Sequence, residues 1–259
     1  MPRHSSSDTL VLSVSPKGES NRTATLFTAE LGIHYATLYG GPKSKMRALV
    51  SPYCRGIMYL YTDEVRHSAK VIDFDVKNFH PTFRESIFKS WAAALAVELL
   101  VRTSCAGSPA ESWPLINGFL DGLDLCDDDA GRTGLIRFLW RYTGLLGIRP
   151  DAGRCCRCGT SFFDKNALSY TTIENAVYSP ADNGFICAGC TGATDPAMLS
   201  LHTDSVRYLG ALSVLAPRQV RSIPVSLRMA QELKQLTFFL IENSAGVRLK
   251  SLESGIGIL

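Results

Sequence analysis

Two cysteine pairs with the same internal spacing are the residues of this chain best suited to chemistry. Cys155 and Cys158 form one C-x-x-C pair, Cys187 and Cys190 form another, and 28 residues lie between the pairs. Four thiolates in two such pairs can surround one tetrahedral Zn²⁺ ion. Cys156 lies two residues before Cys158, and a C-x-C pair of this kind would chelate a metal poorly, so we assign Cys156 no ligand role. The pattern predicts one structural zinc ion per chain, bound by Cys155, Cys158, Cys187 and Cys190 in a zinc-ribbon-like insert.

The sequence contains no pattern typical of a catalytic centre. Four thiolates would leave no position for a water on the metal, which favours a structural ion over a catalytic one. None of the 5 histidines is followed two residues later by glutamate, and H-E-x-x-H and G-x-x-x-x-G-K-[ST] are absent. The acidic run of Asp127, Asp128 and Asp129 is interpreted as a solvated linker. We therefore expect a protein that is not an enzyme; a thiol-redox enzyme using Cys155 and Cys158 is the competing hypothesis.

Basic and aromatic residues gather in residues 1–80, which hold 10 Lys and Arg against 7 Asp and Glu. Basic side chains can follow phosphates while aromatic faces stack on bases, as in single-strand binders of the OB type. The alternative is that the tyrosines are half-buried strand residues and the lysines only keep the surface soluble. The candidate DNA-binding residues are Lys17, Arg22, Lys43, Lys45, Arg47, Tyr35 and Tyr39.

Short runs rich in β-branched and aromatic residues predict five strands in this region, separated by glycine and proline turns. The predicted strands cover residues 9–15, 23–27, 33–39, 56–61 and 69–74. Five strands in about 80 residues fit a five-stranded β-barrel of the OB type, although an SH3-like barrel or half a sandwich would show nearly the same pattern.

After Pro81 the apolar residues recur at the spacing of a helix, three or four residues apart. A T-x-x-E capping box at Thr82 and Glu85 predicts the start of a helix that ends near Arg102. Further helices are predicted at about 113–125, 133–146, 203–215 and 225–243, with short strands at 167–171 and 176–178. The predicted fold is α+β and multidomain. An OB-type domain over residues 1–80 precedes an α-helical domain over 81–259, which carries the zinc-binding insert at about 150–195.

Composition favours a folded protein that does not span a membrane. The chain is 46% hydrophobic and 20% charged, so it can bury a core. Its longest apolar run, residues 91–97, is far shorter than the ~20 residues that cross a bilayer. No hydrophobic signal region is present at the start, so we expect a cytoplasmic location, where the 8 cysteines would be reduced.

Several short motifs, taken in order, resemble the RecO family of bacterial recombination mediators. They are E-S-N-R at 19–22, L-F-T-A-E-L-G at 26–32, Y-G-G-P-K-S-K at 39–45, V-S-P-Y at 50–53, G-I-R-P-D at 147–151 before the first cysteine pair, and L-K-S at 249–251. The resemblance covers nearly the whole chain, and the order of the motifs is more specific than any one of them. It implies an N-terminal OB domain that binds single- and double-stranded DNA, and no catalytic step.

The same resemblance implies a mediator of DNA repair and homologous recombination in the RecF pathway. Such a protein anneals complementary strands and helps to load RecA onto DNA coated by single-strand binding protein (SSB). The implied partners are RecR and the SSB C-terminal tail, with RecA as an indirect partner, at a nucleoid-associated location. The competing function is a zinc-ribbon protein-interaction module of the transcription or translation apparatus. If the basic residues of the barrel do not bind DNA, Arg218, Arg221 and Arg228 become the candidates.

Overall fold

The computed structural model describes residues 3–40, 44–163, 175–192, 197–244 and 249–254. The chain forms two compact units: the first comprises Met1–Gly134 and Leu249–Leu259, and the second comprises Leu135–Arg248. None of the described helices is both long enough and apolar enough to cross a membrane. The division at residues 80 and 81 inferred from the sequence stays a prediction.

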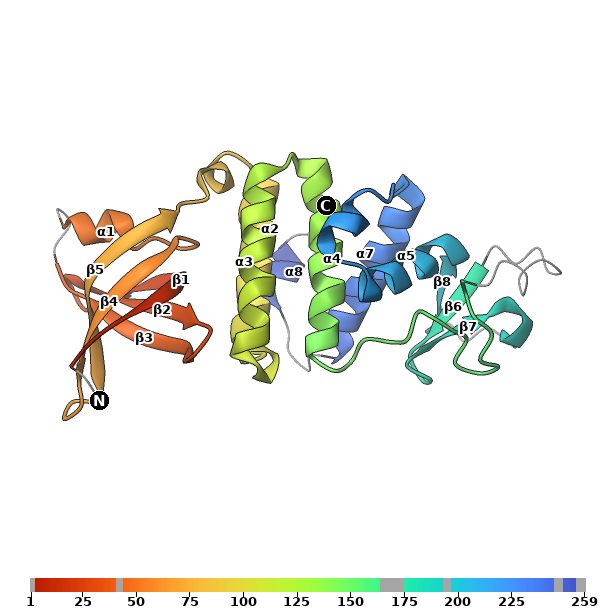
Figure 1. Ribbon diagram of the computed structural model, residues 1–259, viewed down its shortest axis with the longest axis horizontal. Helices are drawn as coiled ribbons and strands as arrows, with labels where there is room; N and C mark the ends of the chain where they lie inside the picture. Colours follow the sequence, from red (N-terminus) through yellow and green to blue (C-terminus); the bar gives the residue numbers. More distant parts are fainter. Residues whose placement is uncertain (1–2, 41–43, 164–174, 193–196, 245–248, 255–259) are drawn as a thin grey trace. The chain divides into compact units, whose positions relative to one another are not determined.

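A closed five-stranded barrel opens the first unit, with the strand order β1-β2-β3-β5-β4 (Figure 1). Its strands are β1 (His4–Lys17), β2 (Asn21–Thr28), β3 (Gly32–Leu38), β4 (Arg55–Asp63) and β5 (Ser68–Asn78). Neighbouring strands are antiparallel except β3 and β5, which meet in parallel at Thr37 and Lys70. Alternate residues such as Ala24, Leu26 and Met58 fill the barrel core. The predicted five-stranded barrel is confirmed.

A short helix that the sequence did not predict, α1 (Lys45–Leu49), connects β3 to β4 (Figure 1). It has only five residues, so it is too short to be stable by its own backbone hydrogen bonds. Met46 and Leu49 pack against the barrel core, and this burial accounts for the helix.

The predicted capping box at Thr82 and Glu85 is wrong. Residues Pro81–Arg84 form a 3-10 helix, η1, and α2 (Ile87–Arg102) begins after it. Ser86 is the N-cap, because its hydroxyl accepts a hydrogen bond from the backbone N–H of Lys89 at 3.1 Å. The Thr82 hydroxyl instead donates to Oδ1 of Asp124 at 2.7 Å, at the end of α3 (Pro109–Leu125). A second 3-10 helix, η2 (Cys105–Gly107), connects α2 to α3.

The acidic run at 127–129 begins a helix, so its interpretation as a linker is also wrong. Asp128 and Asp129 lie in the first turn of α4 (Asp128–Leu145). Oδ1 of Asp127 accepts a hydrogen bond from the backbone N–H of Ala130 at 2.8 Å. Carboxylates are favoured at this end of a helix because they compensate its free N–H groups and its positive dipole end.

The L-K-S motif near the end of the chain docks on α2. The carboxylate of Glu98 accepts hydrogen bonds from the backbone N–H groups of Lys250 at 3.0 Å and Ser251 at 2.8 Å. The indole N–H of Trp91 donates to the Ser251 carbonyl at 2.6 Å. These bonds hold the start of α8 (Lys250–Ser254), and Leu249 and Leu252 are buried beside it. The motif therefore has a structural role in the first unit.

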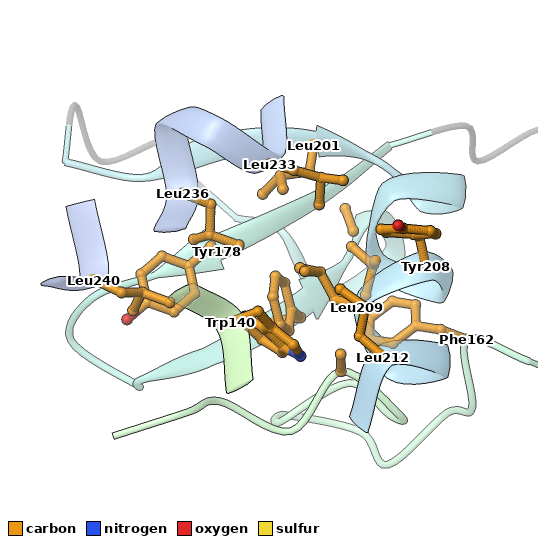
Figure 2. Close-up of a cluster of buried hydrophobic side chains, with 14 of the residues drawn as sticks. Trp140, Phe162, Tyr178, Leu201, Tyr208, Leu209, Leu212, Leu233, Leu236 and Leu240 are labelled. Atoms are coloured by element: carbon orange, nitrogen blue, oxygen red, sulfur yellow. The ribbon is translucent and has the colours of Figure 1, made fainter. Parts of the chain in front are cut away.

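The second unit combines a small sheet with helices around one buried core (Figure 2). Its sheet has the order β7-β6-β8, from β6 (Asn175–Ser179), β7 (Gly184–Cys187) and β8 (Leu199–His202). The helices are α5 (Thr203–Val214), α6 (Pro217–Arg221) and α7 (Leu227–Ser244). Trp140 lies among leucines of α5 and α7 in Figure 2. Strand β8 and helix α6 were not predicted, and the strand predicted at 167–171 lies outside the described residues.

Two side chains of α3, Trp113 and Asp121, contact the barrel. The rings of Phe27 and Trp113 are 5.4 Å apart, and the Arg55 guanidinium lies 5.1 Å from the Trp113 ring. Further along α3, Oδ1 of Asp121 lies 2.6 Å from Nδ2 of Asn78 and 2.9 Å from Nε2 of His80. Asp121 thus bonds to two side chains at the end of the last barrel strand, one on its final residue and one just after it.

We expect Asp121→Ala to lower the free energy of unfolding by about 2 kcal/mol, measured by urea denaturation. The reason is that His80, only 5% exposed, would lose the partner of one ring nitrogen. Asp129→Ala is the matched control, because its side chain is 97% exposed and forms an ion pair with Arg132 at the surface. The control should change stability by less than about 0.5 kcal/mol. Equal effects of the two substitutions would contradict the assigned role of Asp121.

Candidate functional sites

The four cysteines of the two C-x-x-C pairs form one cluster in the second unit. Their Sγ atoms all lie within 4.8 Å of one another. Cys155 and Cys187 are buried members of the core of this unit, whereas Cys158 is exposed. The cluster therefore lies at the edge of the core, with its ligand atoms converging on one point.

A tight turn positions the first cysteine pair. The backbone N–H of Cys155 donates to the Thr160 carbonyl at 2.8 Å, and that of Gly159 donates to the Cys155 carbonyl at 2.9 Å. Gly159 has φ +75°, a left-handed conformation that favours glycine. An isolated bridge between Arg154 and Ser161 closes the turn. The C-x-x-C-G sequence therefore folds back on itself and presents both sulfurs on one side.

The second pair follows strand β7 and is tied directly to the first. Cys187 ends β7, and Cys190 lies in the 3-10 helix η3 (Ala188–Cys190). The backbone N–H of Cys187 donates to Sγ of Cys155 at 3.3 Å. The backbone N–H and the hydroxyl of Thr191 both donate to the Cys187 carbonyl, each at 3.1 Å. An N–H donor aimed at a sulfur stabilises the thiolate form that binds metals.

The cluster favours one thiolate over the others. Hydrogen bonds with Thr160, followed by those with Cys190 and Cys155, lower the pKa of Cys158 to about 6. Hydrogen bonds with Cys158 and Cys187 raise the pKa of Cys190 to about 12. Four sulfurs this close cannot all ionise without a compensating positive charge. A divalent cation bound by all four would supply that charge, so the donor set fits a tetrahedral metal.

Cys156 lies outside this cluster and is exposed. Its backbone N–H donates to the Phe185 carbonyl at 2.9 Å, and its side chain packs over Gly184. A Cβ at Gly184 would lie 2.7 Å from Cβ of Cys156, so glycine is needed for this close approach. The cysteine therefore contributes to the packing of the turn rather than to the group of four sulfurs.

The outer face of the barrel carries exposed tyrosines. The rings of Tyr35, Tyr39 and Tyr59 belong to residues that are 62%, 58% and 43% exposed. Tyr35 and Thr37 lie on the side of β3 opposite the buried Ala36; Tyr35 is exposed, whereas Thr37 is covered. Nζ of Lys17 donates to Oγ1 of Thr37 at 2.9 Å, which places a cation on the tyrosine face of β3. The structure thus brings together three of the predicted residues: Lys17, Tyr35 and Tyr39.

A second cation on this surface, Lys70, was missed by the sequence analysis. Its Nζ lies 4.7 Å from the centre of the Tyr61 ring, and its backbone pairs with Thr37 of β3. A depression of about 510 Å³ is lined in part by Tyr39, Tyr61 and Lys70. The β4–β5 hairpin places Tyr61 opposite Lys70, and that pairing was available from the two predicted strands.

Three other predicted DNA-binding residues, Arg22, Lys45 and Arg47, lie elsewhere in the first unit. Arg22 lies in β2 and pairs with Leu38 of β3. It is on the same side of β2 as the buried Ala24. Lys45 and Arg47 belong to α1, where Lys45 is exposed. Nε of Arg47 is buried and has no hydrogen-bond partner among the described residues. Lys43 lies outside the described residues.

An OB-type barrel, a helical region and a four-cysteine cluster together define a multidomain protein with an N-terminal barrel of the OB class. Residues 1–76 match the family Recombination protein O N terminal, and residues 84–253 match Recombination protein O C terminal. The chain therefore belongs to the RecO family, and the resemblance found in the sequence is confirmed.

Relatives in distant bacteria cover nearly the whole chain. The DNA repair protein RecO of Myxococcus xanthus is 29% identical over 250 residues, which is 95% of this chain and 94% of the relative. The DNA repair protein RecO of an Exiguobacterium species is 26% identical over 237 residues, 90% of this chain and 88% of the relative. The DNA repair protein RecO of Bacillus pumilus is 24% identical over 249 residues, which is 95% of this chain and 91% of the relative.

Proposed function

We propose that this protein acts in DNA repair and recombination as a RecO-type mediator and that it binds DNA through the tyrosine face of its barrel. Membership of the RecO family supports the role in repair and recombination. The observation that supports the DNA contact is the set of exposed rings beside two cations. The tyrosine face is defined here as Tyr35, Tyr39 and Tyr61 with Lys17 and Lys70; Tyr59 lines a separate depression with Asp73 and Asp75.

The exposure of these rings argues for a binding role over a packing role. A tyrosine placed for stability buries most of its ring, whereas Tyr35 and Tyr39 leave more than half of their surface open. Clustered exposed aromatic residues typically mark an interaction surface. Stacked on bases, each ring contributes about 1–3 kcal/mol whatever the base, while lysines neutralise phosphates. The face therefore suits single-stranded DNA without sequence preference.

Membership of the RecO family also supports a finer proposal. The protein anneals complementary strands, binds double-stranded DNA as well, and helps to load RecA onto SSB-coated DNA in the RecF pathway. Its direct protein partners are RecR and the SSB C-terminal tail. Annealing needs bases held without covering their pairing edges, and a stacking face with cations beside it meets that need. None of these steps requires a catalytic residue.

The metal of the cysteine cluster is a structural Zn²⁺ ion, held by Cys155, Cys158, Cys187 and Cys190. Four sulfur ligands in tetrahedral array are typical of zinc, and they leave no position open for chemistry on the ion. Cys155 and Cys187 also belong to the buried core. A bound ion would therefore stabilise the packing of the Cys155–Cys158 turn against strand β7 of the second unit.

The salt dependence of DNA binding tests the tyrosine face. In the full-length protein carrying Lys17→Gln and Lys70→Gln, we expect the slope of log K against log salt to fall by about 1.4, because each phosphate contact on a single strand contributes about 0.7. The measurement is fluorescence anisotropy with a labelled oligonucleotide of about 20 nucleotides at several salt concentrations. Oligonucleotides of different sequence should weaken alike.

The matched control carries Lys234→Gln and Lys250→Gln, which remove the same charge from α7 and α8. It should keep the wild-type slope. If the Lys17 and Lys70 variant also kept the wild-type slope, the barrel face would be ordinary solvated surface and the proposal would fail.

A further inference from the structure

Four arginines of the second unit gather around one face of α4. Arg137 and Arg141 are one turn apart on this helix, so they share a face. The side chain of Arg149 packs against the same helix at Gly144. A Cβ on Gly144 would lie only 2.7 Å from the Nη1 atom of Arg149. Arg221 ends α6, and its charge acts on Arg141 together with the charges of Arg137 and Arg149. The arginine cluster is defined as Arg137, Arg141, Arg149 and Arg221.

Tyr208 lies beside the arginine cluster and orients the guanidinium of Arg137. Nε of Arg137 donates to the hydroxyl oxygen of Tyr208 at 2.6 Å, and the guanidinium carbon lies 5.9 Å from the centre of that ring. The Tyr208 side chain is buried in the core of the unit. It therefore holds Arg137 in place while leaving the Nη groups of that arginine available.

No carboxylate balances the arginine cluster within the described ranges. The ionisable groups that act on Arg141 are Arg137, Tyr208, Arg221 and Arg149. Burial first, and then the neighbouring arginines, lower the pKa of Arg141. Nη2 of Arg141 is buried and has no hydrogen-bond partner in the described part of the chain. Other arginines of this unit do pair with acids: Arg154 with Asp151, and Arg228 with Glu232.

Such an arrangement is costly unless an anion completes it. A buried donor without an acceptor loses its hydration and gains no replacement, and like charges at short range repel. Guanidinium groups match the oxygens of a phosphate in paired hydrogen bonds. We propose that the arginine cluster is an oxyanion site that binds phosphate groups of the DNA backbone, separate from the barrel and additional to the function proposed above.

The surroundings favour DNA over an acidic peptide as the occupant. Peptide recognition needs an apolar anchor in a pocket beside the charges. Three large apolar side chains of this part of α4 and α5, Trp140, Leu209 and Leu212, are at most 2% exposed, whereas Val214 at the end of α5 is exposed. The three buried side chains belong to the core shown in Figure 2, so they are not available as an anchor beside the charges. Phosphate binding needs cations alone.

The first test measures DNA binding by the full-length protein carrying Arg141→Gln and Arg149→Gln. We expect the affinity for a labelled 20-nucleotide single strand to fall about 10- to 30-fold at about 0.1 M salt, with a decrease of about 1.4 in the salt slope. The charge-matched control carries Arg132→Gln and Arg154→Gln, whose arginines already have carboxylate partners. It should keep the wild-type slope. A wild-type slope in the Arg141 and Arg149 variant overturns the inference.

A second test separates a ligand site from a structural one. Without ligand, the Arg141→Gln and Arg149→Gln variant should melt at the wild-type temperature or above it, because an unpaired, partly buried charge is removed. Inorganic phosphate should raise the Tm of the wild type and not that of the variant. Equal stabilisation of both proteins by phosphate overturns the site. Arg221→Gln, on the exposed α6, provides a variant that disturbs no core packing and should lower the slope by about 0.7.

The outcomes distinguish this site from the tyrosine face. Loss of DNA binding only in the Lys17 and Lys70 variant overturns the arginine site and leaves the proposed function intact. Loss only in the arginine variant supports the arginine site and rejects the tyrosine face. If the arginine variant keeps its DNA affinity but no longer binds an acidic peptide, the cluster is a peptide site and the inference is overturned.

Discussion

Replacing Cys187 with serine is expected to abolish metal binding and to destabilise the second unit by more than about 4 kcal/mol. Binding and folding free energies are linked at a structural metal site, so losing one ligand also weakens the fold. Cys187 is only 8% exposed, and its backbone N–H is bonded to Sγ of Cys155. The effect should therefore extend from the cluster into the core. The measurements are the zinc content per chain and thermal unfolding.

The exposed Cys156 provides the control for this prediction. Cys156→Ser should retain close to one zinc per chain and the wild-type Tm, because its sulfur lies outside the cluster. Thiol titration with and without a chelator separates a closed zinc site from a redox pair, since bound thiolates are protected from the reagent. Metal-free wild-type protein with an unchanged melting temperature would contradict the zinc assignment.

Removing the ring of Tyr39 should weaken DNA binding by about 1–3 kcal/mol, or about 5- to 150-fold, without changing the salt slope. Tyr39 is 58% exposed and lines the same depression as Tyr61 and Lys70. A stacking contact neutralises no phosphate, so its loss lowers affinity equally at every salt concentration. The measurement is again anisotropy with a single-stranded oligonucleotide, comparing Tyr39→Ala with the wild type.

Two further variants sharpen this result. Tyr39→Phe should bind nearly as well as the wild type, because it keeps the ring that stacks. Phe79→Ala removes another exposed aromatic side chain, 53% exposed and not among the residues lining the depression, and should leave affinity unchanged. Tyr39→Ala binding with wild-type affinity would show that this ring does not stack on bases.

Local patterns in the sequence determined most of the elements and the metal cluster. Period-two alternation is a property of each strand alone, so all five barrel strands were predicted, although β1 and β5 extend well beyond their predicted bounds. The C-x-x-C spacing likewise restricts each sulfur pair to one turn, and the four sulfurs do converge. Elements stabilised mainly by burial, such as α1 and β8, carried no comparable local signal.

Helix starts show where local patterns failed. Thr82 had the sequence of an N-cap, yet its hydroxyl bonds to Asp124, 42 residues later, and Ser86 caps α2 instead. Asp127 had the sequence of a linker and in fact accepts a hydrogen bond from Ala130 at the start of α4. A hydroxyl or carboxylate has several acceptors or donors within reach, and the one it takes depends on which element the fold brings near.

The binding surfaces were decided by tertiary structure. Lys17 and Tyr35 were named from the sequence, but Lys70 joins them only because barrel closure pairs β5 with β3. Arg137 and Arg141 share a face by helical spacing, whereas Arg149 and Arg221 reach that face only through the turn after α4 and the packing of α6. Spacing along one element follows from backbone geometry, while proximity between elements follows from burial of a common core. The charges that meet at a surface therefore depend on packing that no local pattern encodes.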